Sequence, residues 1–177
     1  MPGLRARPIV AVLALAGAMA AAPACGPGVD LQKITVTDVL TGYYDGGVVK
    51  DGAMSGWNHM LPSITFKLKN DSDAPMSGVR LTVAFWPAGK DAELDSLEVP
   101  GISAEQDLAP GAATEAITVR STVGFNLEAA RAELFNQSGF LDITAKLFAK
   151  RSGQIVPIGA FKLDRRLIPS QQAAKRP

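Results

Sequence analysis

The chain has very few of the residues that build covalent, metal or catalytic sites. It contains one cysteine, Cys25, and one histidine, His59, among 177 residues. A single cysteine excludes a disulfide within the chain, and a single histidine excludes a metal site built on several histidines. Stability must therefore come from a hydrophobic core, and the chain is long enough to form one domain with a sizeable core.

The chain also lacks an excess of charge of either sign. It carries 18 basic and 17 acidic residues, and without the N-terminal arginines Arg5 and Arg7 the net charge falls from +1 to −1. Phosphate binding needs a surplus of lysine and arginine, so this balance argues against nucleic acid as a partner. Hydrophobic residues make up 47% of the chain and charged residues 20%, which favours a folded domain over a disordered one.

The charges that are present are unevenly distributed along the chain. Residues 91–142 hold ten acidic residues against Arg120 and Arg131, whereas from Lys146 onward eight basic residues accompany Asp164 alone. One interpretation is a solvated β-hairpin followed by a frayed basic tail. The other is a contact with anionic head groups or an acidic partner, to which each basic residue contributes about 1 kcal/mol.

The N-terminus has the pattern of an export signal. Two arginines precede an apolar stretch at residues 9–22, which is too short to span a bilayer because a spanning helix needs about 20 apolar residues. Ala22 and Ala24 are the small residues that a signal peptidase requires. We therefore expect residues 1–24 to be a signal peptide and Cys25 to begin the exported protein.

The run Ala22-Pro23-Ala24-Cys25 resembles the lipobox of bacterial lipoproteins. The resemblance implies that the Cys25 thiol carries a lipid and that residues 25–30 tether the domain to a bacterial membrane, facing the periplasm. Gly26 stands where an aspartate favours retention in the inner membrane, so the expected location is the outer membrane. The alternative is an ordinary secreted protein that keeps a free thiol.

Alternation with a period of two dominates the rest of the chain and predicts β-strands. The most regular segment alternates between an apolar face that begins at Leu141 and a polar face that includes Lys146. The segment from Thr41 to His59 is rich in glycine and aspartate and is expected to be a long loop. The other expected strands lie at residues 31–40, 63–69, 79–86, 97–102, 116–119 and 158–163.

One short helix is expected after these central strands. Asn126 is a suitable N-cap, and Gly139 is a suitable stop. The apolar helical stripe consists of Leu127, Ala130, Leu134 and Phe135. About seven strands and one short helix favour an all-β, two-sheet sandwich over residues 31–169, followed by a disordered basic tail at residues 170–177.

Turn motifs between the strands carry a second resemblance. An Asn70-Asp71-Ser72 turn follows the strand at residues 63–69, the next strand ends in Phe85-Trp86, and Leu108-Ala109-Pro110-Gly111 precedes a further strand. This order resembles the immunoglobulin-like domains of the FxLYD and late-embryogenesis-abundant type, over residues 63–119. The resemblance implies an immunoglobulin-like β-sandwich with a non-enzymatic role, and it transfers no site residues.

The sequence offers little for an enzyme or a metal site. A catalytic triad would have to combine His59 with an aspartate and with Ser55 or Ser63, yet no nucleophile-elbow pattern surrounds either serine. The oxygen-bearing residues Asn70, Asp71 and Asp73 lack the rest of a calcium-loop pattern, and turn formation explains them. We therefore expect no enzyme activity, no metal and no cofactor.

Two functional hypotheses follow from these features. The first is a lipid-anchored accessory or protein-binding domain of the cell envelope that contacts an envelope protein through exposed aromatic residues. Its candidate surface residues are Tyr43, Tyr44, Trp57, His59, Trp86 and Phe148. Burial of the loop aromatics at one end of the sandwich is the competing interpretation. The alternative function is a carrier of a small apolar ligand or lipid, held between the sheets or beneath Leu134 and Phe135.

Overall fold

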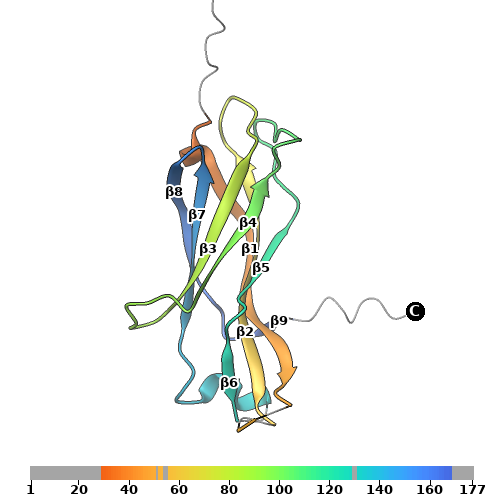
Figure 1. The fold of residues 1–177 in the computed structure, drawn as a ribbon. Helices are drawn as coiled ribbons and strands as arrows, with labels where there is room; N and C mark the ends of the chain where they lie inside the picture. The colour runs from red at the N-terminus through yellow and green to blue at the C-terminus, as the bar shows by residue number, and fades with distance from the viewer. Residues whose placement is uncertain (1–28, 51, 54–55, 129–130, 169–177) are drawn as a thin grey trace, which may run out of the picture.

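The computed structural model describes residues 29–50, 52–53, 56–128 and 131–168, which form a β-sandwich of two sheets (Figure 1). The predicted signal peptide, the lipidation site Cys25 and the basic tail lie outside the described residues. Both sheets and all of the described core lie within residues 29–168, so this span carries the whole sandwich.

The larger sheet has five strands. Four of them lie in the order β5-β2-β1-β9, and the fifth, β6, pairs with the first residues of β2. All pairs are antiparallel except β1 with β9, which is parallel. The strands are β1 (Ile34–Val48), β2 (Asn58–Asn70), β5 (Ile117–Arg120), β6 (Phe125–Leu127) and β9 (Leu167–Ile168).

The smaller sheet is fully antiparallel, with its four strands in the order β4-β3-β7-β8. The chain crosses from one sheet to the other four times, between β2 and β3, β4 and β5, β6 and β7, and β8 and β9. This arrangement is the immunoglobulin-like sandwich, and the all-β prediction is confirmed with nine strands among the described residues. The four strands are β3 (Val79–Pro87), β4 (Asp95–Ile102), β7 (Ile143–Arg151) and β8 (Gln154–Lys162).

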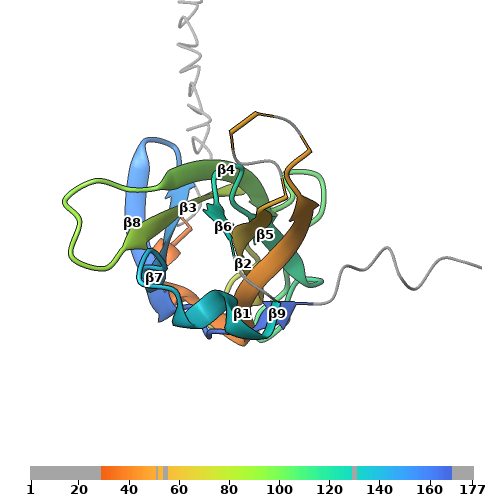
Figure 2. The ribbon, with the colours of Figure 1, turned by 90° about the horizontal axis from the view of Figure 1, so that it is seen from below.

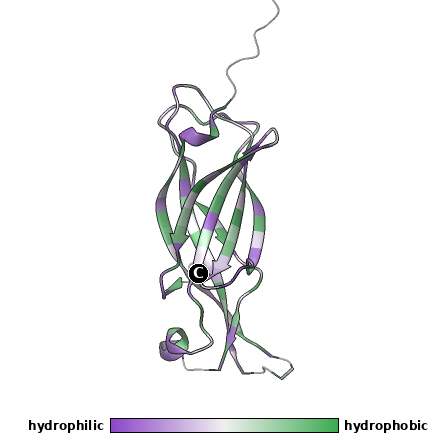
Figure 3. Ribbon diagram, turned by 90° about the vertical axis from the view of Figure 1, so that its left-hand side faces the viewer, coloured by the Kyte–Doolittle hydropathy of each residue, from purple (hydrophilic) through white to green (hydrophobic). Residues whose placement is uncertain are grey.

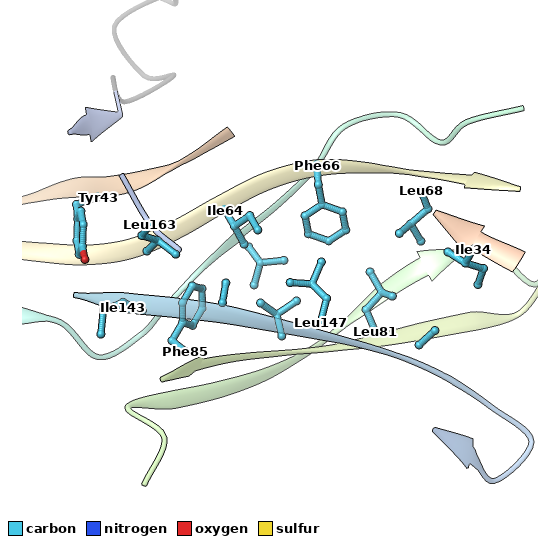
Figure 4. Packing of buried hydrophobic residues seen from close by; sticks show 14 of the residues in the cluster. Ile34, Tyr43, Ile64, Phe66, Leu68, Leu81, Phe85, Ile143, Leu147 and Leu163 are labelled. Atoms are coloured by element: carbon cyan, nitrogen blue, oxygen red, sulfur yellow. The ribbon is translucent and has the colours of Figure 1, made fainter. Parts of the chain in front are cut away.

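The core follows from the alternation that the sequence predicts. On β7 the side chains of Ile143, Ala145, Leu147 and Ala149 are all fully buried, while those between them face outward. Bands of hydrophobic and hydrophilic residues alternate along the strands in Figure 3. Figure 4 shows the inward side chains of both sheets meeting in the space between them, as in the packed core of a folded domain.

The prediction of a long loop from Thr41 to His59 is wrong for most of this segment. β1 continues to Val48 and β2 begins at Asn58, so most of this segment forms a hairpin that extends past the smaller sheet (Figure 1). Gly46 and Gly47 do not break the ladder because they occupy a register shift between Asp45 and Val48, and Gly42 pairs regularly with Ser63. A Cβ atom at Gly46 would lie 2.7 Å from Cδ2 of His59, so glycine lets the imidazole pack against the strand.

The prediction of a short helix capped by Asn126 is also wrong. Phe125, Asn126 and Leu127 form β6, which pairs with the start of β2, and the only helical turn that follows in the described residues is the 3-10 helix η2 (Arg131–Asn136). The pairing requires Gly124, because a Cβ atom there would overlap the carbonyl oxygen of Met60. Asn126 therefore serves the sheet and does not cap a helix.

The two ends of the sandwich differ in what closes them. The N-terminal end carries the 3-10 helix η1 (Leu31–Lys33) and the turn between β7 and β8. The far end carries the β1-β2 hairpin, β6 and η2, and Figure 2 looks at the molecule from this end. These two ends and the outer face of the smaller sheet are the three places where a site is to be sought.

Candidate functional site

The structure divides the six predicted surface residues between two regions. Trp86 and Phe148 belong to β3 and β7 and lie on the outer face of the smaller sheet. The other four belong to the far end, on β1, β2 or the hairpin that joins them: Tyr43, Tyr44, Trp57 and His59. The candidates therefore do not form a single surface.

The prediction that Tyr43 belongs to a partner-binding surface is corrected, because its side chain is fully buried and unavailable to a partner. Its ring lies 4.9 Å from that of Phe140, 5.5 Å from Phe135 and 6.5 Å from Phe125, measured between centroids. Burial, with the nearby Asp142 carboxylate, raises the pKa of the phenol above its usual value. We call Tyr43, Phe125, Phe135 and Phe140 the far-end cluster, and its role is to pack η2 and β6 against β1.

The remaining far-end candidates are half-buried and have partners within the chain. The Arg120 guanidinium lies over the Tyr44 ring at 3.4 Å from the centroid. Nδ1 of His59 is 2.6 Å from Oδ1 of Asn126, which ties β2 to β6. The carbonyl of Trp57 accepts a hydrogen bond from the amide of Val49 and closes the hairpin.

The geometry of the far end does not assemble a catalytic triad around His59. Ser63 is buried, and its hydroxyl donates to the carbonyl of Val119 at 3.3 Å. His59 and Ser63 are four residues apart on the same strand, a separation of about 13 Å. The other serine considered, Ser55, lies outside the described residues.

The oxygen-bearing residues of the Asn70 turn are used in the fold. Asn70 is fully buried, and its amide group donates to the carbonyls of Ala74 and Leu108, both at 2.9 Å. Its Oδ1 atom accepts from the amide and the hydroxyl of Ser72. Asp71 accepts from Thr35 and pairs with Lys69, and both interactions lower its pKa. Sequence reasoning predicted the turn but missed that Asn70 joins it to the Leu108-Ala109-Pro110-Gly111 motif.

The outer face of the smaller sheet offers a different environment. Register places Phe148 opposite Thr82, Lys146 opposite Ala84, and Thr144 opposite Trp86, in three successive rows. The Lys146 ammonium lies over the Trp86 ring at 4.1 Å from the centroid, a cation-π contact. We call Trp86, Lys146 and Phe148 the outer-face patch. The prediction from alternation that Trp86 and Phe148 face away from the core is confirmed.

The surroundings of the outer-face patch are cationic. Arg80 and Lys150 occupy the next row on the N-terminal side, and Lys162, which pairs with Asp142 at 2.9 Å, lies opposite Thr144 on the other side. Glu98 pairs with both Arg80 and Lys150, and the hydrogen bond from Lys150 holds the pKa of this carboxyl below its usual value. The described part of this face thus carries more basic than acidic groups.

Two open grooves lie near the N-terminal end of the described surface. One of about 420 Å³ is lined by residues 101–103, 106–108 and 113–117. A second, of about 240 Å³, is lined by Gly78, Arg80 and residues 150–155 at the turn between β7 and β8. Leu134, beneath which a ligand was considered, is buried against the core.

The described residues hold neither a metal-binding cluster nor a membrane-spanning helix. They include no group of three or more histidine, cysteine or acidic side chains placed to hold a metal. No helix within the described ranges is long and apolar enough to cross a membrane. Among known proteins, no family model matches the chain, and no curated protein matches it in sequence.

Proposed function

We propose that this protein is a non-catalytic, protein-binding domain of the bacterial cell envelope, held at a membrane through a lipid on Cys25. The single observation that carries the binding role is the outer-face patch, where Trp86 and Phe148 lie with Lys146 on a surface rather than in the core. The anchor rests on the lipobox-like run in the sequence.

The chemistry of the outer-face patch defines the kind of partner. Aromatic residues with adjacent cations are the side chains that dominate the binding energy of protein interfaces. Basic side chains border the patch on two sides, at Arg80 and Lys150 and at Lys162. The complementary partner is a protein that presents an apolar contact bordered by acidic side chains.

The packing of the sandwich favours this function over a ligand carrier. Phe66, Leu81 and Leu147 from the two sheets are fully buried, and their side chains occupy the space in which a ligand would have to lie (Figure 4). A carrier needs an apolar cavity in this space. The resemblance to non-enzymatic immunoglobulin-like domains also supports a binding role.

Alanine substitution at the outer-face patch tests the proposal. Trp86→Ala and Phe148→Ala each remove a contact side chain and should weaken binding of an envelope partner about 30-fold or more. Binding is measured by co-purification from membranes of the native host and then by titration with the isolated partner. Tyr44→Ala is the matched control, because it removes a half-buried aromatic residue that also stacks with a cation, at the far end.

The control separates a binding role from a structural one. Each variant is melted alongside the parent, and the unfolding temperatures must stay close for the comparison to hold. Loss of the partner with Tyr44→Ala and its retention with Trp86→Ala and Phe148→Ala would overturn the proposed surface.

A further inference from the structure

The turn between β7 and β8 brings three basic side chains to one groove at the N-terminal end. Arg80 and Lys150 lie opposite each other on β3 and β7, and Arg151 follows at the end of β7. All three line the groove of about 240 Å³ together with Ser152 and Gly153 of the turn. Guanidinium and ammonium groups around one hollow are the donors that bind phosphate.

The charges within this groove are only partly compensated. Glu98 is the acidic side chain that pairs with Arg80 and Lys150, and it is shared between them. Arg151 has no ion pair with any described residue. Asp30 borders an adjoining hollow beside Arg151, and its carboxylate, which accepts a hydrogen bond from the amide of Gln32 at 3.0 Å, adds a second negative charge against the three basic side chains. The groove therefore keeps a net positive charge.

An apolar side chain stands at the mouth of the groove. Ile155 is opposite Lys150 on β8, and its exposed fraction of 61% is the highest among the exposed large hydrophobic residues of the described chain. A cationic groove beside an exposed isoleucine is a combination that fits the interface of a bilayer, where phosphates and the ends of the acyl chains lie together.

The path of the chain brings the same end toward Cys25. Val29, the first described residue, lines a hollow together with Arg151, Ser152 and Gln154. Cys25 precedes Val29 by four residues, a span of at most about 14 Å when extended. A lipid on Cys25 would therefore hold this groove, and not the far end, at the membrane surface.

We infer that the groove formed by Arg80, Lys150 and Arg151 binds the phosphate of an anionic membrane lipid, with Ile155 entering the head-group region. This contact adjoins the outer-face patch, whose border it shares at Arg80 and Lys150, and it would orient the sandwich with the far end away from the bilayer. That the groove lies near the membrane rests on the proposed lipid anchor at Cys25. The affinity of the groove for lipid does not depend on this anchor, so a test on protein without the anchor can refute the groove without refuting the anchor.

The test uses residues 29–168, which carry the whole sandwich and contain no cysteine. Sedimentation with vesicles should show binding to phosphatidylglycerol-containing vesicles and little binding to phosphatidylcholine alone. The double variant Arg80→Gln/Arg151→Gln should bind about 25-fold more weakly, because each basic residue near an anionic surface contributes a factor of about five. Melting curves establish that the variant remains folded.

A matched variant controls for net charge. Lys67→Gln/Lys90→Gln removes the same charge from exposed side chains away from the groove, and it should retain most of the binding. Equal losses in the two double variants, or equal binding to neutral vesicles, would overturn the inference. Binding of glycerol phosphate in solution without binding to vesicles would rule out a membrane lipid as the ligand.

A polarity-sensitive fluorophore reports the orientation directly. Ile155→Cys and Val48→Cys each introduce the only thiol of this span, at positions that are 61% and 51% exposed. The label at position 155 should shift to the blue with anionic vesicles, while the label at position 48 at the far end should not. A shift at position 48 alone would contradict the inferred orientation.

Discussion

The far-end cluster and the outer-face patch are both built from aromatic side chains, yet they are placed for opposite roles. Tyr43 of the far-end cluster is fully buried, and three phenylalanine rings surround it. Trp86 of the outer-face patch packs instead beneath the amine of Lys146 on the surface of a sheet. An aromatic residue outside the central core can therefore be buried by neighbouring rings, as Tyr43 is, or remain on a surface, as Trp86 does.

The far-end cluster is expected to give the largest loss of stability. Tyr43→Ala should lower the free energy of unfolding by about 4 kcal/mol, because it leaves a cavity among the rings of Phe125, Phe135 and Phe140. Phe148→Ala on the outer-face patch should cost about 1 kcal/mol or less. Urea denaturation of both variants checks the comparison, and similar losses would erase the distinction between the two regions.

The N-terminal end provides a polar counterpart to the far-end cluster. Asn70→Ala should lower the free energy of unfolding by about 3 kcal/mol, because the carbonyls of Ala74 and Leu108 and the amide of Ser72 lose their partner. Asn136→Ala, at an exposed position, should change it by less than about 0.5 kcal/mol. A small effect of Asn70→Ala in urea denaturation would show that water replaces these bonds.

Alkaline pH is expected to act selectively on the far-end cluster. Burial raises the pKa of Tyr43 in the folded state above its usual value of 10.0. Above that pH the unfolded chain ionises at Tyr43 while the folded chain does not, so stability is full below pH 10 and falls as the pH rises. The loss should approach about 1.4 kcal/mol per pH unit.

The variant Tyr43→Phe isolates this titration from that of other groups. It removes a hydroxyl that lies near the backbone of Ile143 but forms no hydrogen bond of good geometry with any described residue. At neutral pH its stability should match or slightly exceed that of the parent. Unfolding free energies of the two proteins from pH 7 to pH 11 should diverge in favour of the variant, and parallel curves would refute the assignment.

A substitution on the outer face of the smaller sheet is expected to give the smallest change in stability, and this change should be a gain. The Thr82 hydroxyl is covered between Glu98 and Phe148 and has no hydrogen-bond partner among the described residues. Thr82→Val should raise stability by about 1 kcal/mol at most, because it removes an unpaired polar group from a strand. Thermal unfolding measures this change, and a loss of stability would show that the hydroxyl has a partner.

Local patterns in the sequence account for most of the fold. Alternation predicted which side chains of β7 face the core, and it placed Trp86 and Phe148 on the outer face. The turn at Asn70 was predicted because asparagine bonds its own backbone two residues on. These features depend on neighbours within a few residues, so the sequence is sufficient to predict them.

The features that the sequence did not predict depend on distant contacts. Glycine and aspartate around Tyr43 indicated a loop, but the partners that bury Tyr43 come from residues 125–140. The Asn126 side chain is taken by His59, 67 residues earlier, which removes the expected helix cap. Neither contact has a local signature, and Cys25 lies beyond the described residues altogether.

Site-specific cross-linking tests the proposed surface most directly. A photoreactive phenylalanine analogue is placed at position 148 in the outer-face patch, or at the exposed position Val48 at the far end, in the full chain expressed in its native host. We predict one discrete envelope protein cross-linked from position 148, lost on adding Trp86→Ala, and none from position 48. Cross-links from position 48 alone would contradict the proposed surface.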